Sequence, residues 1–200
     1  MPLLAPHLRA VAYDRAGIGG SEPAPGEITI ERQISDLISV ITGLETGPCV
    51  LAGHSWGGIL VQLLAFRRPD LVSGLVLVDP GHEAMERGLP LPVQWGMRLL
   101  RTVVHDELSV DPDVTAAALR EMRAAERSFP DVPVVVMSAA NGFPPRFRAY
   151  WTDLQEELVV AAPQARHVAA AGTGHQIPMV RPRLVADVIL SVAEQVRGGR

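Results

Sequence analysis

Apolar residues follow two alternating patterns along the chain. Short runs of apolar, often β-branched residues alternate with longer stretches in which apolar residues recur every three or four positions. The first pattern is typical of strands and the second of helices with one apolar face. This alternation predicts an α/β fold, with a mostly parallel sheet of about five strands covered by helices.

The predicted elements divide the chain into a core and an insertion. Strands are predicted at residues 9–13, 49–52, 74–78, 132–137 and 168–171, and helices at residues 30–44, 56–68, 116–127, 150–158 and 182–196. Between residues 80 and 130 the pattern changes to helical pieces punctuated by proline, with no clear strand. We therefore expect residues 1–80 and 131–200 to form the core, and residues 81–130 to form a helical lid inserted into it.

Composition narrows the class of protein. With 48% hydrophobic and 20% charged residues, the chain can bury enough apolar surface to fold. No apolar run approaches the roughly 18 residues that span a bilayer. The single cysteine, Cys49, excludes an intramolecular disulfide and a multi-cysteine zinc site. The basic residues are all arginine, scattered along the chain and outnumbered by acidic ones, 18 against 22, so nucleic-acid binding is not expected.

The segment Gly53-His-Ser-Trp-Gly57 matches the pattern G-x-S-x-G. It lies between a predicted strand and a predicted helix, which is the context in which this pattern forms a nucleophile elbow. Such a turn raises the serine hydroxyl at the carboxyl end of the strand and needs glycines where a Cβ would clash. The alternative is a glycine-rich turn whose Ser55 caps a helix. His54 is expected to point away from Ser55.

Three motifs together resemble the α/β-hydrolase superfamily. They are Tyr13-Asp-Arg-Ala-Gly-Ile-Gly-Gly-Ser21, Gly53-His-Ser-Trp-Gly-Gly58 and Gly174-His175, in the order found in the family. Together they cover essentially the whole chain. The resemblance implies a partial α/β-hydrolase fold and a serine hydrolase whose substrate enters beneath the helical lid.

The nucleophile needs a base, for which histidine has a suitable pKa. His175 follows the last predicted strand in a loop that can reach the sheet edge carrying Ser55, and its position is similar to that of the family's base. His175 is therefore the candidate base. A surface-loop histidine is the alternative.

The acid that orients the base is harder to assign. In most of the superfamily it follows the strand corresponding to residues 132–137, but the loop after that strand holds Asn141 and no carboxylate. Asp79 stands at the carboxyl end of the preceding predicted strand, an arrangement similar to that of some members of the superfamily. We expect Asp79 to be the acid, with Asp153 and Glu83 as fallbacks. Alternatively, Asp79 caps the turn into Pro80.

These assignments predict a carboxylesterase-like serine hydrolase that cleaves an ester, thioester or amide bond of a small-molecule substrate. Ser55 forms the acyl-enzyme, and the backbone N–H of Trp56 helps to hold the oxyanion. No cofactor, metal, nucleic-acid or membrane partner is expected, and the oligomeric state stays open. Two alternatives remain: a truncated, weakly active or non-catalytic remnant, and an acyltransferase or perhydrolase using the same three residues.

The N-terminus departs from the family pattern. The resemblance implies a second oxyanion donor on a loop after an earlier strand, and no such strand precedes Arg9. We therefore expect three N-terminal strands to be missing, with Met1 internal to a longer reading frame. The expected result is a gap near 9.6 Å, about two strand spacings, between residues 9–13 and 49–52, with lower stability and activity than in a full-length relative. No secretory signal is present in the sequence, which predicts a cytoplasmic protein.

Overall fold

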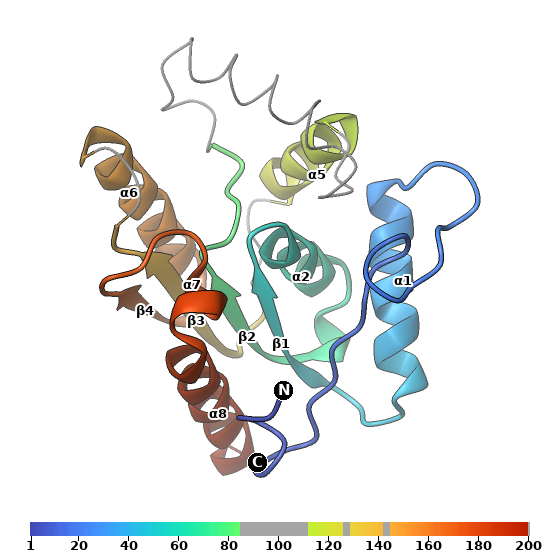
Figure 1. Ribbon diagram of the computed structural model, residues 1–200, viewed down its shortest axis with the longest axis horizontal. Helices are drawn as coiled ribbons and strands as arrows, with labels where there is room; N and C mark the ends of the chain where they lie inside the picture. The colour runs from blue at the N-terminus through green and yellow to red at the C-terminus, as the bar shows by residue number, and fades with distance from the viewer. Residues whose placement is uncertain (85–111, 126–128, 142–144, 200) are drawn as a thin grey trace.

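A parallel sheet forms the centre of the molecule in the computed structural model, which describes residues 1–84, 112–125, 129–141 and 145–199. Its four strands lie in chain order, and each neighbouring pair is parallel (Figure 1). They are β1 (Cys49–His54), β2 (Val72–Val78), β3 (Pro133–Ala139) and β4 (Gln164–Ala170). The predicted parallel α/β fold is confirmed, with four strands in the described residues.

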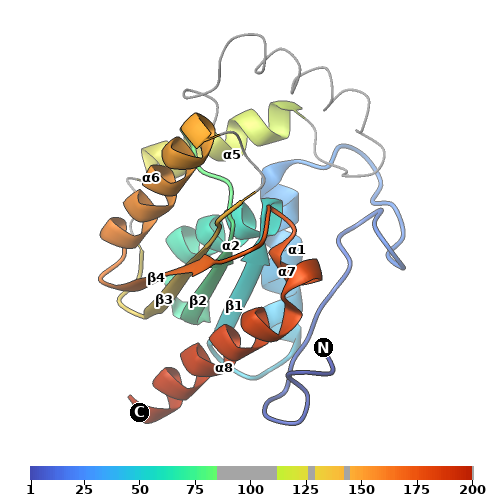
Figure 2. The ribbon, with the colours of Figure 1, turned by 60° about the vertical axis from the view of Figure 1, so that its left-hand side comes forward.

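Helices cover both faces of the sheet (Figures 1 and 2). On one face lie α1 (Ile30–Gly43), α2 (Trp56–Arg67), α5 (Pro112–Ala124) and α6 (Pro145–Ala161). On the other lie α7 (Ile177–Val180) and α8 (Pro182–Gly198), and the short 3-10 helix η1 (Pro69–Leu71) leads into β2. Among the described helices, none has both the length and the apolar character needed to cross a membrane.

The strands feed two separate apolar cores because successive side chains point to opposite faces of a sheet. Leu75 and Leu77 of β2 pack into the core beneath α1, α2 and α5. Val76 and Val78 pack into the core beneath α8. Helix α2 is buried on nearly all sides because it lies between the sheet and the helices α1 and α5. The near-continuous apolar sequence of β2 thus reflects burial on both faces.

The prediction of a strand at residues 9–13 is wrong. This segment joins no sheet, so the described sheet has four strands and not about five. The physical reason is that a strand needs a hydrogen-bonding neighbour, and a cavity of about 710 Å³ lies between this segment and β1. The sequence of the segment has β propensity, but propensity alone does not supply a partner strand.

The predicted lid, residues 81–130, falls largely outside the described residues, which omit 85–111 and 126–128. The part that is described, α5, buries Val114, Leu119 and Met122 in the same core as α1 and α2. The helix predicted at residues 116–127 therefore exists, beginning four residues earlier. The division into core and lid stays a prediction.

Candidate active site

Ser55 lies on a tight turn between β1 and α2. Its backbone has φ 52° and ψ −117°, in a region that residues other than glycine rarely adopt. The turn is held by hydrogen bonds from the Ser55 N–H to the carbonyl of Val78 (3.1 Å) and from the Gly58 N–H to the carbonyl of Ser55 (3.0 Å). The strand–turn–helix context that gives the G-x-S-x-G pattern its meaning is therefore present.

Two of the three glycines in the turn are required sterically. A Cβ on Gly53 would lie 2.3 Å from the carbonyl oxygen of Gly57, and one on Gly58 would lie 2.6 Å from the Cβ of Pro80. A Cβ on Gly57 would meet nothing within 4 Å. The expected clash on either side of the serine is thus found at Gly53 but not at Gly57.

The structure brings together Ser55, His175 and Asp79. The Oγ of Ser55 lies 3.0 Å from Nε2 of His175, and Nδ1 of His175 lies 2.7 Å from Oδ2 of Asp79. Because a carboxylate can only accept, Nδ1 carries the proton, which leaves Nε2 free to accept from the serine hydroxyl. The three residues lie at the carboxyl end of the sheet, after β1, β2 and β4.

Asp79 is completely buried, and the carboxylate oxygen that does not contact His175 accepts two hydrogen bonds. Its Oδ1 accepts hydrogen bonds from the backbone N–H of Ala139 (3.0 Å) and from Nε1 of Trp151 (2.8 Å). Its backbone also adopts a positive φ, 43°. Trp151 was missed in the sequence because it occupies an ordinary apolar position of a predicted helix. Its indole N–H fixes the orientation of the carboxylate relative to His175.

The fallback acids lie elsewhere. Asp153 is exposed on α6, and Glu83 is buried beside His82, with Oε2 3.5 Å from Nδ1 of that ring. The backbone N–H of Asn141 donates to the carbonyl of Thr173 at 2.8 Å. This bond ties the loop after β3 to the loop that carries His175.

His54 packs against His175, and its expected orientation away from Ser55 stays a prediction. Its Nε2 donates to the carbonyl oxygen of His175 at 2.7 Å, and the two ring centroids lie 4.7 Å apart. Burial lowers the pKa of His54, and this outweighs the raising effect of the hydrogen bond to that carbonyl. A neutral His54 therefore braces the loop of His175 against the serine turn. His54 and His175 lie far apart in the sequence, so the sequence gave no sign of this contact.

The segment from Tyr13 to Ser21 is anchored beside the same turn. The Oε1 atom of Gln33, on α1, accepts from Nε1 of Trp56 and from the guanidinium of Arg15, both at 2.9 Å. Within the segment, Oδ2 of Asp14 accepts from the N–H of Gly20 at 2.9 Å. Burial lowers the pKa of Arg15. Two of the motifs found in the sequence thus meet through one buried glutamine.

No cluster of three or more His, Cys, Asp or Glu side chains arranged to hold a metal ion occurs in the part of the chain that the structure describes. The polar groups around Ser55 are instead joined to one another in a chain of hydrogen bonds. This chain can move a proton between a hydroxyl and an imidazole held by a carboxylate.

A parallel sheet with a serine on a strand–turn–helix elbow is the arrangement expected of a serine α/β hydrolase, and the chain belongs to the alpha/beta hydrolase family, whose model matches residues 1–188. The chain is 28% identical to the lipase LipV of Mycobacterium tuberculosis over 208 residues, covering 96% of this chain and 73% of that one. It is thus a hydrolase enzyme of the α/β fold.

Solved structures agree with this assignment. A thermophilic esterase from Thermogutta terrifontis is similar over 90% of this chain and 78% of its own, with 25% identity and a TM-score of 0.58. A hydrolase from Pseudomonas aeruginosa, at 21% identity, matches over 96% of this chain and 82% of its own with a TM-score of 0.63, and supports the fold alone.

Proposed function

We propose that the protein is a serine hydrolase that cleaves an ester, thioester or amide bond of a small molecule through an acyl-enzyme on Ser55. The observation that carries this proposal is the unbroken line of contacts from the Oγ of Ser55 through His175 to Asp79, at 3.0 and 2.7 Å. Both distances are within hydrogen-bond reach for a nucleophile, its base and the group that orients the base. The names of two similar proteins, a lipase and an esterase, support the proposal of ester cleavage.

In the first half of the reaction, the Oγ of Ser55 attacks the carbonyl carbon of the substrate while Nε2 of His175 takes the hydroxyl proton. The carboxylate of Asp79 stabilises the imidazolium that forms, because it already accepts from Nδ1. The imidazolium then gives its proton to the leaving oxygen, sulfur or nitrogen. The carbonyl–leaving-group bond breaks, and the acyl group stays on Ser55.

The backbone N–H of Trp56 is the candidate donor to the oxyanion. Trp56 is the first residue of α2, so its N–H has no acceptor within the helix, and the helix dipole places partial positive charge there. One such donor contributes about 10²- to 10³-fold to the rate.

In the second half, Nε2 of His175 takes a proton from water, and the hydroxide oxygen attacks the acyl carbon. The proton then returns to the Oγ of Ser55 as the ester bond to the enzyme breaks. The products are a carboxylic acid and the free enzyme, so the cycle closes with no other reactant.

A fluorophosphonate probe tests the proposal directly. We expect covalent labelling of the folded protein, with the adduct located on Ser55 by peptide mass spectrometry and abolished by Ser55→Ala. Ser73 is a matched control, because it lies near the amino end of β2 whereas Ser55 lies at the carboxyl end of the sheet, and Ser73→Ala should label normally. Folded protein that hydrolyses no p-nitrophenyl ester and takes no label would refute the proposal.

A further inference from the structure

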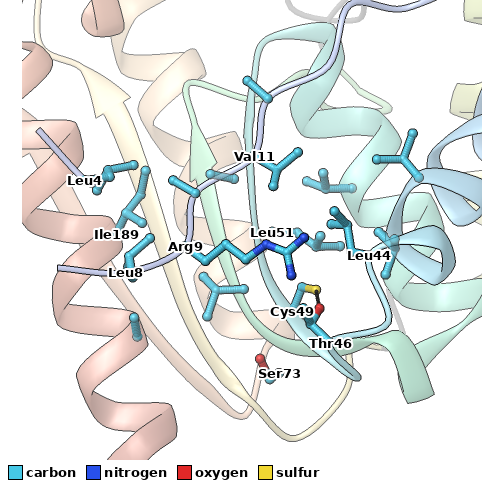
Figure 3. Close-up of a pocket in the computed structure, with 18 of the residues that line it drawn as sticks. Leu4, Leu8, Arg9, Val11, Leu44, Thr46, Cys49, Leu51, Ser73 and Ile189 are labelled. Atoms are coloured by element: carbon cyan, nitrogen blue, oxygen red, sulfur yellow. Dashed lines mark hydrogen bonds between the residues drawn. The ribbon is translucent and has the colours of Figure 1, made fainter. Parts of the chain in front are cut away.

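The carboxylate of Asp79 is held by β3 and α6, away from the cavity beside β1. Figure 3 shows that cavity between Leu8 and Val11 of the N-terminal segment and Leu51 of β1. In the part of the chain that the structure describes, no residue of β3 or α6 lines it. The hydrogen bonds to Oδ1 of Asp79 come from these two elements. The support of the carboxylate is therefore separate from the outer edge of β1.

Asp79 continues the β2–β3 ladder with its side chain. The last pair in register is Val78 with Met137, and the N–H of Asp79 donates to the carbonyl of Met137 at 2.7 Å. In a regular parallel ladder, the next bond would run from the N–H of Ala139 to the main-chain carbonyl of residue 79. That N–H donates instead to Oδ1 of Asp79 at 3.0 Å. The carboxylate thus takes the position of a main-chain acceptor, and the register of the sheet sets its place.

The backbone at Asp79 accounts for this exchange. Its φ of 43° turns the chain out of the extended conformation directly after β2. The chain then packs onto the serine turn, where the N–H of Gly81 donates to the carbonyl of Ser55 at 3.3 Å. Aspartate tolerates a left-handed backbone better than most residues do. The turn that ends β2 therefore leaves one carboxylate oxygen to β3 and the other to His175.

A single donor on Oδ1 would leave the carboxylate free to rotate about that bond. The second donor, Nε1 of Trp151 at 2.8 Å, removes this freedom and leaves Oδ2 for Nδ1 of His175. Trp151 is itself fixed, because its side chain is buried and its ring stacks on that of Phe147 at a centroid distance of 6.1 Å. One helical turn later, Nε2 of Gln155 donates to the carbonyl of Pro80 at 3.3 Å. Helix α6 therefore holds both the carboxylate and the residue that follows it.

We propose that Trp151 is a positioning residue of the reaction, which acts on turnover through Asp79 and by its indole N–H rather than by its ring. This inference rests on the proposed function. The imidazolium of His175 exists only along the reaction path, so a correctly turned carboxylate stabilises the transition state and not the bound substrate. Loss of the indole N–H should therefore lower kcat and leave KM nearly unchanged.

Two substitutions at residue 151 separate the N–H from the ring. Trp151→Phe removes the donor and part of the ring. Benzothienylalanine, incorporated at the same position, keeps the shape of the indole with sulfur in place of the N–H. With a p-nitrophenyl ester, we expect kcat to fall about 10- to 100-fold in both proteins, as for loss of a hydrogen bond to a charged group. The original kcat in the benzothienyl protein would overturn the proposal, because the ring alone would then suffice.

Tyr150→Phe is the matched control. Tyr150 lies beside Trp151 on α6, and its hydroxyl donates to the carbonyl of Ala84 at 2.5 Å. The variant therefore removes a hydrogen-bond donor from the same helix and leaves the donor to Asp79 in place, so it should keep the original kcat. An equal loss in this variant would overturn the proposal in favour of a general disturbance of α6. Urea denaturation checks that each protein unfolds cooperatively.

A proton signal separates failure of this inference from failure of the proposed function. The hydrogen on Nδ1 of His175 lies in a short bond to a carboxylate, with 2.7 Å between the heavy atoms, and such protons resonate downfield of the amide region. The signal is assigned by its absence in His175→Gln. We expect it to move upfield in the benzothienyl protein, because the carboxylate turns away from Nδ1, and to stay in place in Tyr150→Phe.

The two readouts give distinct outcomes. An unchanged signal in the benzothienyl protein would overturn the inference, whether or not the original protein hydrolyses an ester. If the signal moves but the original protein neither hydrolyses an ester nor takes the fluorophosphonate label, the proposed function fails and the role of Trp151 in holding Asp79 stands.

Discussion

The carboxyl end of β1 and its outer edge differ in how completely their polar groups are hydrogen-bonded. At its carboxyl end, Ser55 bonds to Val78 of β2, Asp79 bonds to β3 and α6, and His175 is held by Asp79 and His54. Along its outer edge, the same strand borders a cavity and pairs with nothing in the described sheet. The contrast shows that the contacts among Ser55, Asp79 and His175 are held from the side of β2, β3 and β4.

The largest expected effect comes from a substitution among the hydrogen-bonded residues at the carboxyl end of the sheet. In Asp79→Asn, the amide Oδ1 can still accept from Ala139 and Trp151, but the NH₂ group faces His175. It forces the proton of the ring onto Nε2, so the base cannot accept from Ser55. We expect kcat for a p-nitrophenyl ester to fall about 10⁴-fold with little change in Tm. A loss of less than tenfold would mean that Asp79 does not orient the base.

The second prediction compares two leucines that are partners across the β1–β2 pair. Leu51 and Leu75 lie opposite each other, but Leu51 lines the cavity and is 7% exposed, whereas Leu75 is 0% exposed. Leu75→Ala should lower the free energy of unfolding by about 3–5 kcal/mol, and Leu51→Ala by about 2 kcal/mol, because Leu51 has fewer contacts to lose. Urea denaturation of the two variants measures the difference. Equal losses would show that the cavity wall is packed as tightly as the core.

The smallest expected effect is a pH dependence carried by His54, whose ring faces His175 and Asp79. Burial lowers its pKa in the folded protein. As the pH falls below about 6.5, the unfolded chain takes up a proton that the folded chain resists, so stability falls until the pH passes the folded pKa. The urea midpoint should therefore drop less between pH 7 and pH 5 in His54→Gln than in the original protein. The two proteins differ only at residue 54, so the difference between their profiles isolates His54; identical profiles would contradict the prediction.

Much of the fold could be predicted from the sequence because burial on both faces leaves a plain signal. The runs at residues 74–78 and 132–137 are almost wholly apolar, and both are central strands. The segment at residues 9–13 carries a similar local signal but forms no strand. Local pattern reports what a segment prefers, and the presence of a pairing neighbour depends on parts of the molecule far away in sequence.

The candidate site shows the same limit. Ser55, Asp79 and His175 were identified because each follows a strand in a polar or glycine-rich loop. Trp151 and His54 were not, because their contacts join α6 to the loop after β2 and the serine turn to the loop after β4. A tryptophan on an apolar helix face gives no local sign that its N–H orients a carboxylate 72 residues away.

The order of the strands has a consequence for the time course of folding. Ser55, Asp79 and His175 follow the first, second and fourth strands of a sheet whose order is that of the chain. The nucleophile and acid can be placed once β3 has docked, but the base arrives only with β4. In a refolding experiment, reactivity toward a fluorophosphonate should therefore appear no earlier than the docking of β4. The rate at which Ser55 becomes labelled then reports the last step of assembly.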